Sequence, residues 1–147
     1  MFTHKNLALG LLLCGSVLST TVLAEEPTIS VYKSPICGCC SQWISHLEAS
    51  GFKVDPIDTS DLRTIKTRSG IAPEMASCHT AQVGGYVIEG HVPAEDIRRL
   101  LAEHPDARGL TVPGMPPGSP GMDTPNPRHY QVLLMGKDGS TEVFAEH

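Results

Sequence analysis

Hydrophobic and polar positions alternate with two different periods near the start of the chain. Residues 28–32 and 52–57 alternate with a period of two and contain several β-branched side chains, which predicts two strands. Between them, residues 41–50 carry Trp43 and Leu47 at a helical spacing. The pattern therefore predicts a strand, a helix and a second strand.

The pattern continues with two more helices and a pair of strands. Residues 58–69 and 93–103 have polar or acidic starts followed by apolar positions at helical spacing, which predicts two helices. Residues 80–88 predict two short strands around the turn-forming pair Gly84-Gly85. This alternation of strands and helices is typical of the α/β class.

Residues 110–127 interrupt the regular pattern. Proline and glycine dominate there and no periodicity survives, which predicts a long Pro/Gly/Met-rich loop. After it, residues 130–135 and 140–144 flank Asp138-Gly139, which predicts a C-terminal β-hairpin. We expect an α/β, thioredoxin-like fold with a central mixed sheet and flanking helices, because a Cys-x-x-Cys motif lies between the first strand and the first helix.

Residues 1–24 have the features of a secretory signal. Lys5 gives a positive start, residues 7–18 form an apolar run, and small or aliphatic residues end the segment. We predict cleavage near Ala24, which leaves residues 25–147 as a single exported thioredoxin-like domain. The apolar run is too short to anchor the mature chain in a membrane.

The charge of the chain argues against two classes of partner. The formal net charge is -5 at pH 7, and a mildly acidic small domain lacks the basic surface that binds nucleic acid. No basic amphipathic stretch follows the signal, so we expect no binding to a membrane surface after cleavage.

The spacing of the cysteines is the strongest signal for chemistry in the sequence. The chain has 5 cysteines, of which Cys14 lies in the predicted signal. Exported proteins usually pair their cysteines in disulfides, but Cys37, Cys39 and Cys40 lie almost side by side and only Cys78 is distant. A structural disulfide, Cys37–Cys40 or Cys40–Cys78, would leave the other thiols as spectators. We therefore favour a metal site, since thiolates select Cu(I), zinc or iron–sulfur clusters.

The expected fold brings the distant cysteine to the other three. In a thioredoxin-like domain, the segment before the third strand packs against the Cys-x-x-Cys loop, and Cys78 occupies that segment. The helix start favours thiolates through its free N–H groups. Four thiolates carry four negative charges, which four Cu(I) ions would neutralise and one zinc ion would only halve. The sequence thus predicts several Cu(I) ions held by Cys37, Cys39, Cys40 and Cys78.

Thioethers and imidazoles near these cysteines are further candidate ligands. Met115 and Met122 lie in the predicted loop, where a core role is harder to argue, and thioethers bind Cu(I). His79 adjoins Cys78, although a capping or surface role remains an alternative. His91 is interpreted as structural or exposed. The complete set of predicted metal ligands is Cys37, Cys39, Cys40, Cys78, His79, Met115 and Met122.

Several sequence blocks together resemble the CopG family of periplasmic copper-resistance proteins. The blocks are Cys37-Gly38-Cys39-Cys40 with Trp43, Ala76-Ser77-Cys78-His79-Thr80-Ala81, Gly85-Tyr86-Val87-Ile88-Glu89-Gly90-His91-Val92-Pro93, Gly109-Leu110-Thr111-Val112-Pro113-Gly114-Met115-Pro116 and Gly118-Ser119-Pro120-Gly121-Met122. The resemblance extends from about Thr28 to Phe144. It implies a thioredoxin-like fold, a cysteine-bridged multicopper cluster whose cysteines match the four predicted above, and a role in copper tolerance. Redox interconversion of Cu(I) and Cu(II) is one route to such tolerance.

Two other functions fit the same cysteines. A thiol–disulfide oxidoreductase would use only Cys37 and Cys40, and a small zinc or structural module would also accept thiolate ligands. Copper ions, and other periplasmic copper-handling proteins that donate or receive them, are the expected partners. The sequence leaves open whether the chain turns over as a copper oxidoreductase.

Overall fold

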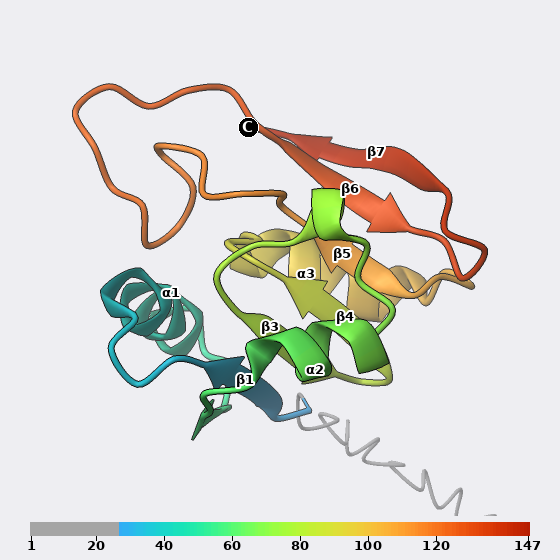
Figure 1. Cartoon of the computed structure of the whole chain (residues 1–147). Helices are drawn as coiled ribbons and strands as arrows, with labels where there is room; N and C mark the ends of the chain where they lie inside the picture. Colours follow the sequence, from blue (N-terminus) through green and yellow to red (C-terminus); the bar gives the residue numbers. More distant parts are fainter. Residues whose placement is uncertain (1–26) are drawn as a thin grey trace, which may run out of the picture.

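The computed structural model describes residues 27–147, and its order of elements follows the sequence pattern closely (Figure 1). The predicted signal, residues 1–24, lies outside the described residues. Strands and helices alternate over most of the described range, as expected for the α/β class. The elements are β1 (Ile29–Lys33), α1 (Gly38–Ala49), β2 (Val54–Asp58), α2 (Leu62–Arg68), the 3₁₀ turn η1 (Pro73–Met75), β3 (Thr80–Val83), β4 (Tyr86–Glu89), α3 (Ala94–Glu103), β5 (Gly109–Thr111), β6 (Gln131–Met135) and β7 (Thr141–Glu146).

The strands of the described residues form one 7-stranded mixed sheet in the order β2-β1-β3-β4-β5-β6-β7. β1 and β2 are parallel, while β3 is antiparallel to both β1 and β4. The helices α1 and α2 precede β3, and α3 follows β4. This arrangement is thioredoxin-like, so the predicted fold class is confirmed.

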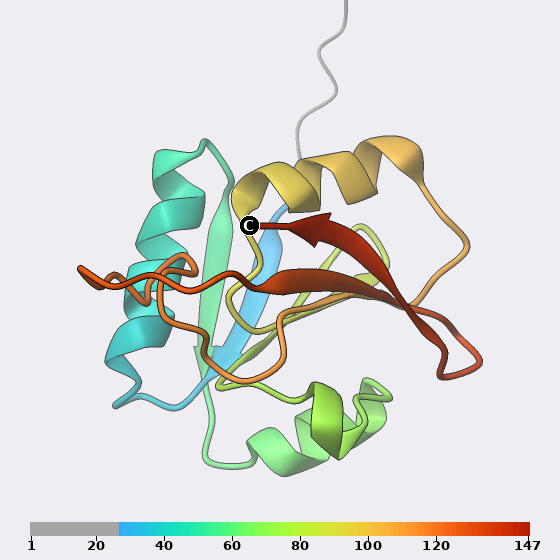
Figure 2. The same ribbon diagram turned by 90° about the horizontal axis from the view of Figure 1, so that it is seen from above.

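One hydrophobic cluster holds α1 and α3 against the sheet. α1 contributes Trp43 and Leu47, α3 contributes Ile97 and Leu100, and strand β1 contributes Val31. Full burial of one such side chain contributes roughly 1.5–3 kcal/mol. α2 lies on the opposite side of the sheet from α3 (Figure 2), and none of its side chains is fully buried. The core therefore fixes α1, whose first turn carries the cysteines, more firmly than it fixes α2.

The sheet extends further than the sequence pattern predicted. β5 overlaps the start of the segment predicted as loop, and it pairs in parallel with β4 and antiparallel with β6. A strand of 3 residues is too short to produce a periodic pattern. Gly109 has a φ of 151°, and a Cβ there would collide with the backbone of Val87. Glycine is therefore required where β5 meets β4, and β5 joins the C-terminal hairpin to the rest of the sheet.

Residues 112–130, called here the 112–130 loop, connect β5 to β6. Figures 1 and 2 both show this loop, in orange, running toward α1 and alongside it. Gly121 makes the contact, because a Cβ added to it would lie 2.8 Å from both the Cys39 carbonyl oxygen and the Trp43 backbone nitrogen. The backbone N–H of Met122 donates to the Ser119 carbonyl oxygen at 2.8 Å and stabilises the turn. The loop is thus packed on the cysteine-bearing end of α1.

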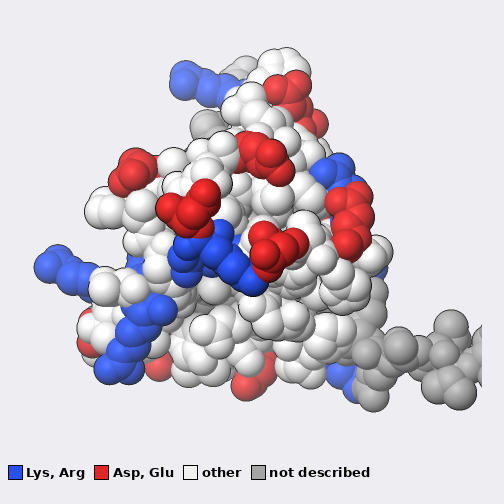
Figure 3. Space-filling model, turned by 90° about the vertical axis from the view of Figure 1, so that its right-hand side faces the viewer, with Lys and Arg blue, Asp and Glu red and all other residues white. Residues whose placement is uncertain are grey.

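The face shown in Figure 3 carries charges of both signs, with Lys and Arg side chains beside Asp and Glu side chains. Lys137 and Asp106 form an exposed ion pair, and Arg99 pairs with Glu103 within α3. Exposed pairs of this kind contribute roughly 0–1 kcal/mol each, so they matter little for stability. None of the helices in residues 27–147 is long and apolar enough to cross a bilayer.

Candidate metal centre

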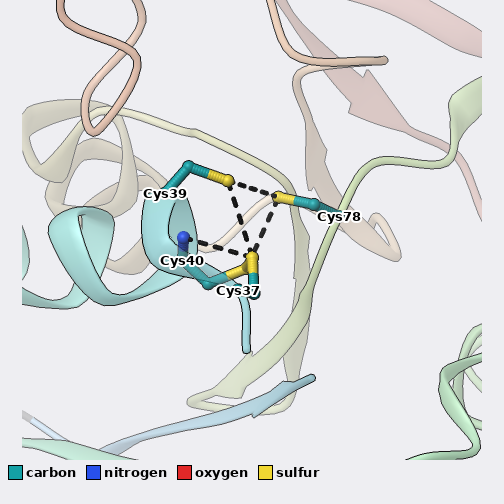
Figure 4. A group of neighbouring side chains, drawn as sticks. All are labelled: Cys37, Cys39, Cys40 and Cys78. Atoms are coloured by element: carbon teal, nitrogen blue, oxygen red, sulfur yellow. Dashed lines mark hydrogen bonds between the residues drawn. A yellow bond between two sulfur atoms is a disulfide. The ribbon is translucent and has the colours of Figure 1, made fainter. Parts of the chain in front are cut away.

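The first turn of α1 presents three of the four cysteines. Cys37 is the N-cap residue, and its sulfur accepts a hydrogen bond from the Cys40 backbone N–H at 3.3 Å. Cys39 and Cys40 follow within the helix (Figure 4). The free N–H groups and the dipole at a helix start stabilise negative charge on sulfur. The local sequence therefore gathers sulfur atoms at a position that favours thiolates.

Two of these cysteines form a disulfide bond. Cys37 and Cys40 are joined, while Cys39 and Cys78 are free thiols. This pairing is one of the two that the sequence spacing allowed. Its reduction releases two more sulfur ligands, so the disulfide-bonded protein is the oxidised form of a four-thiol site.

Cys78 approaches the group from the opposite side, just before β3. Its sulfur lies 3.6 Å from the Cys40 sulfur and 3.9 Å from the Cys39 sulfur, and the sulfurs of Cys37 and Cys39 are 3.5 Å apart. All four sulfur atoms lie within 4.8 Å of one another, and Figure 4 shows them pointing toward a common centre. The fold thus brings together cysteines from two separate segments of the chain.

A buried carboxylate holds the Cys78 segment in place. Glu89 is fully buried and accepts hydrogen bonds from the Ser77 backbone N–H at 2.7 Å and from the Thr80 hydroxyl at 2.6 Å. The Lys66 ammonium group donates to the same carboxylate. Burial raises the pKa of Glu89, although the charge of Lys66 acts in the opposite direction. Because Ser77 and Thr80 flank Cys78, these bonds fix the backbone on both sides of it.

Burial also governs the protonation of Cys78. Removal from water, followed by the effect of the nearby Cys39 sulfur, raises the pKa of the Cys78 thiol to about 12. The thiol therefore keeps its proton at neutral pH when no cation is near. A positive ion beside the sulfur reverses this preference, because it stabilises the thiolate. Metal binding at this position would therefore displace a proton.

Two buried imidazoles flank the Cys78 sulfur. His79 Nδ1 lies 3.1 Å from this sulfur and His91 Nε2 lies 3.0 Å from it, and both rings are fully buried. Burial, and then the charges of His91 and Lys66, lower the pKa of His79 to about 3. Burial also lowers the pKa of His91. Both rings are therefore neutral at pH 7, and each offers a lone pair as a ligand.

His91 is the site residue that sequence reasoning missed. The pattern indicated a structural or exposed histidine, whereas the structure buries the ring against the Cys78 sulfur. The pairing of β3 with β4 explains the contact: Thr80 pairs with Glu89, so Cys78 and His91 stand opposite each other two residues further out. Counting outward from the predicted hairpin turn gives the same partners.

The two candidate methionines lie in the 112–130 loop. Met115 is 51% exposed, and Met122 is half buried beside the helix contact made by Gly121. The Gly118 N–H donates to the Met122 carbonyl oxygen at 2.9 Å, which holds this part of the loop in a turn. Their role as metal ligands stays a prediction.

Comparisons with known proteins place these features in a family. Two solved structures, described as copper resistance protein CopG, forms 2 and 1, are each 45% identical to this chain and cover 84% of it. The matches cover 99% and 98% of those chains, with TM-scores of 0.80 and 0.79. The chain belongs to the CopG family. A comparison with curated proteins found no match.

A sequence-family model described as a protein of unknown function, DUF411, matches residues 75–122 of this CopG family member. The matched segment holds Cys78, His79 and His91 and ends at Met122, within the 112–130 loop. It therefore covers the part of the site that lies outside the Cys-x-x-Cys motif. In the reduced protein, four sulfurs and two imidazole nitrogens would converge here, and such soft donors select Cu(I) or zinc over hard cations.

Proposed function

We propose that this CopG family member is a copper-binding protein of copper resistance. It holds several Cu(I) ions bridged by the thiolates of Cys37, Cys39, Cys40 and Cys78. The observation that carries the proposal is the gathering of four sulfur atoms within 4.8 Å of one another. The similar structures are described as copper resistance proteins, which supports copper as the metal.

The spacing of the sulfurs supports more than one ion. Neighbouring sulfur atoms are 3.5, 3.6 and 3.9 Å apart. Two metal–sulfur bonds of about 2.3 Å each can bridge any of these gaps. Each thiolate can also contact two ions at once. Monovalent Cu(I) then neutralises the thiolate charges one by one, and the proton of Cys78 leaves as a copper ion arrives.

The Cys37–Cys40 disulfide supports a further role as a copper oxidoreductase. Reduction of two Cu(II) ions to Cu(I) needs two electrons. The thiolates of Cys37 and Cys40 supply one electron each and become joined by a sulfur–sulfur bond. Cys39 and Cys78 are outside this disulfide, so their sulfurs would remain available to hold copper during this step.

We also assign His79, Met115 and Met122 as additional copper ligands. The contact of His79 with the Cys78 sulfur supports the first assignment. The exposed position of Met115 supports a role in copper uptake at the edge of the site. Replacing both methionines with leucine should slow the uptake of Cu(I) in stopped-flow measurements and leave the free energy of unfolding nearly unchanged.

The proposal also includes export of the chain from the cytoplasm. We infer that residues 1–24 direct the chain to the periplasm, that cleavage occurs near Ala24, and that residues 25–147 act there as one domain. Other periplasmic copper-handling proteins would donate and receive the ions. The mass of the protein from a periplasmic extract tests this, and an uncleaved chain found only in the cytoplasm would contradict it.

Copper stoichiometry tests the central proposal. Protein reduced anaerobically and loaded with Cu(I) is expected to bind more than one ion per chain. Cys39→Ser and Cys78→Ser should each lower this number. Ser45→Ala, at an exposed position of α1, is the matched control and should not change it. A stoichiometry of zero, or full loading of both cysteine variants, would contradict the proposal.

A thiol–disulfide oxidoreductase is the second candidate, and the disulfide at the start of α1 favours it. Such an enzyme needs only Cys37 and Cys40. A Cys39→Ser/Cys78→Ser double variant should then reduce insulin disulfides as fast as the unchanged protein. The copper proposal expects no appreciable reduction of insulin by this variant. Competition between equal amounts of Cu(I) and zinc distinguishes these two candidate functions from a zinc module, which would retain zinc.

A further inference from the structure

Cys78 and His91 stand opposite each other just beyond the β3–β4 hairpin. The Cys78 sulfur lies 3.0 Å from His91 Nε2 and 3.1 Å from His79 Nδ1, and ligand atoms of the three residues lie within 4.8 Å of one another. We propose that Cys78, His79 and His91 hold one copper ion on their own while the Cys37–Cys40 disulfide is intact. The proposal rests on the proposed function and adds a second, mixed sulfur–nitrogen mode of binding to it.

The disulfide removes two thiolates from the cysteine group and leaves these three residues unchanged. Cys37 and Cys40 in a disulfide no longer provide negative sulfur ligands. Cys78 is a free thiol in the same structure, and it faces both imidazoles. The oxidised protein therefore still offers one thiolate and two neutral nitrogen donors at one place.

A backbone carbonyl group determines which nitrogen of His91 faces the sulfur. His91 Nδ1 lies 2.8 Å from the Pro120 carbonyl oxygen. A carbonyl oxygen can only accept a hydrogen bond, so Nδ1 carries the ring hydrogen. In the neutral ring, Nε2 then has the free lone pair, and Nε2 is the atom that faces Cys78. Partners of this kind orient the histidine ligands of many metal sites.

His79 is buried without a full set of hydrogen bonds. Its Nε2 has no hydrogen-bond partner among the described residues, while its Nδ1 faces the Cys78 sulfur. The ring packs against Trp43 with 4.3 Å between the ring centroids. With Nδ1 as the lone-pair donor, the ring hydrogen lies on Nε2. The support for a ligand role of His79 is therefore the 3.1 Å contact of Nδ1 with the Cys78 sulfur.

The spacing of the donors suits a copper ion after a small expansion. Bonds of about 2.3 Å to sulfur and about 2.0 Å to nitrogen place two donors roughly 3.5 Å apart at tetrahedral angles. The observed sulfur–nitrogen distances of 3.0 and 3.1 Å are a few tenths of an ångström shorter. One thiolate with two imidazoles is also the core ligand set of mononuclear copper sites that carry out electron transfer. The three residues can therefore keep copper bound in either oxidation state.

The 112–130 loop encloses this group of donors. Pro120 contacts His91 from one side, and the Ser77 hydroxyl donates to the Gly114 carbonyl oxygen next to the Cys78 segment. The loop is thus bonded to both segments that supply the donors. It acts as the positioning element for His91.

Copper loading of the oxidised Cys39→Ser protein tests this site. In mature protein whose Cys37–Cys40 disulfide is confirmed by peptide mapping, Cys78 is then the remaining thiol. After anaerobic loading with Cu(I), we expect one ion per chain. Copper X-ray absorption should show a sulfur ligand together with imidazole nitrogens. No bound copper, or copper held by sulfur without imidazole, would overturn the proposal.

A histidine pair provides the matched variants on the Cys39→Ser background. His91→Phe should weaken copper binding at least about tenfold and reduce the imidazole signal, whereas exposed His129→Gln should change neither. If His91→Phe fails to fold, the copper X-ray absorption spectrum of the Cys39→Ser protein still tests whether imidazole binds the ion. Copper bound by the reduced wild-type protein but not by the oxidised variant rejects this site and leaves the cluster proposal standing. No copper in either form rejects both.

Discussion

Trp43 donates its indole N–H to the carbonyl oxygen of Val92, 2.9 Å away, and both residues are almost completely buried. The bond joins the helix that carries three cysteines to the residue that follows His91. The same indole packs against His79. Trp43 therefore couples the segments from which the candidate ligands come.

Replacing Trp43 with Phe should weaken both the fold and the site. The smaller ring leaves a void and an unpaired carbonyl oxygen, so the free energy of unfolding should fall by about 2–4 kcal/mol in urea denaturation. Tyr86→Phe removes a comparable hydrogen bond, to the Pro105 carbonyl oxygen at 2.8 Å, far from the cysteines. It should cost about 1 kcal/mol and leave copper retention unchanged. Equal copper retention in both variants would disprove the coupling.

Gly121→Ala should loosen the 112–130 loop from α1. A Cβ at Gly121 would lie 2.8 Å from the Cys39 carbonyl oxygen, whereas a Cβ at Gly139, in the turn between β6 and β7, would meet no atom within 4 Å. Both glycines have positive φ values, 83° and 89°, so the backbone strain of the two substitutions is matched. We expect Gly121→Ala to release Cu(I) to a chelator about tenfold faster, which corresponds to about 1.4 kcal/mol. Gly139→Ala should release it at the wild-type rate, and similar rates for the two variants would contradict the contact.

The Lys66–Glu89 pair should show strong coupling. Lys66→Met leaves the buried Glu89 carboxylate without its cation, which should destabilise the apo-protein by about 3 kcal/mol at pH 7. Lowering the pH should reduce this loss, because burial raises the pKa of Glu89 and the protonated group no longer needs the cation. The double variant Lys66→Met/Glu89→Gln should lose less stability than the sum of the single variants. Additive losses in urea denaturation would show that the pair is not coupled.

His46 should make the apo-protein less stable in mild acid. Its Nε2 accepts a hydrogen bond from the Ala94 N–H at the start of α3, which requires the neutral ring. Burial lowers the pKa of His46 from 6.5, with Glu95 and Asp123 acting in the opposite direction. Below pH 6.5 the unfolded chain takes up the proton first, so this contribution is present above that pH and is lost as the pH falls.

The His46→Gln variant isolates this effect, because the Gln side chain accepts the same hydrogen bond without titrating. Between about pH 7.5 and pH 5 the wild-type protein should lose more stability than the variant, by less than about 1 kcal/mol, the usual size of a capping bond. Identical pH profiles for the two proteins would remove His46 from the acid response.

The sequence predicted the features that follow from local periodicity and spacing. Trp43 and Leu47 mark the buried side of α1, and the predicted turn separates β3 from β4 as expected. The position of Cys78 before the third strand led to the expectation that it faces the Cys-x-x-Cys loop, and its sulfur lies 3.6 Å from that of Cys40. These inferences succeed because each depends on one element or on a well-defined fold.

The sequence pattern did not predict two features of the structure, for different physical reasons. β5 depends on Gly109 fitting closely against Val87, and the sequence pattern carries no signal for such a backbone contact. His91 becomes a site residue through cross-strand pairing and through the Pro120 carbonyl oxygen, which comes from a distant loop. The cross-strand pairing can be counted from the sequence, but the contact with the Pro120 carbonyl oxygen cannot.

The 112–130 loop leaves the sheet at β5 and returns to it at the neighbouring strand β6, with Thr111 paired to Leu133. A short turn could join the same two strands. A longer loop costs little more, because the entropic cost of loop closure grows only slowly with loop length. The loop can therefore change in length or composition while β5 and β6 stay paired. The part of metal retention that depends on this loop can for this reason change in evolution with little effect on the sheet.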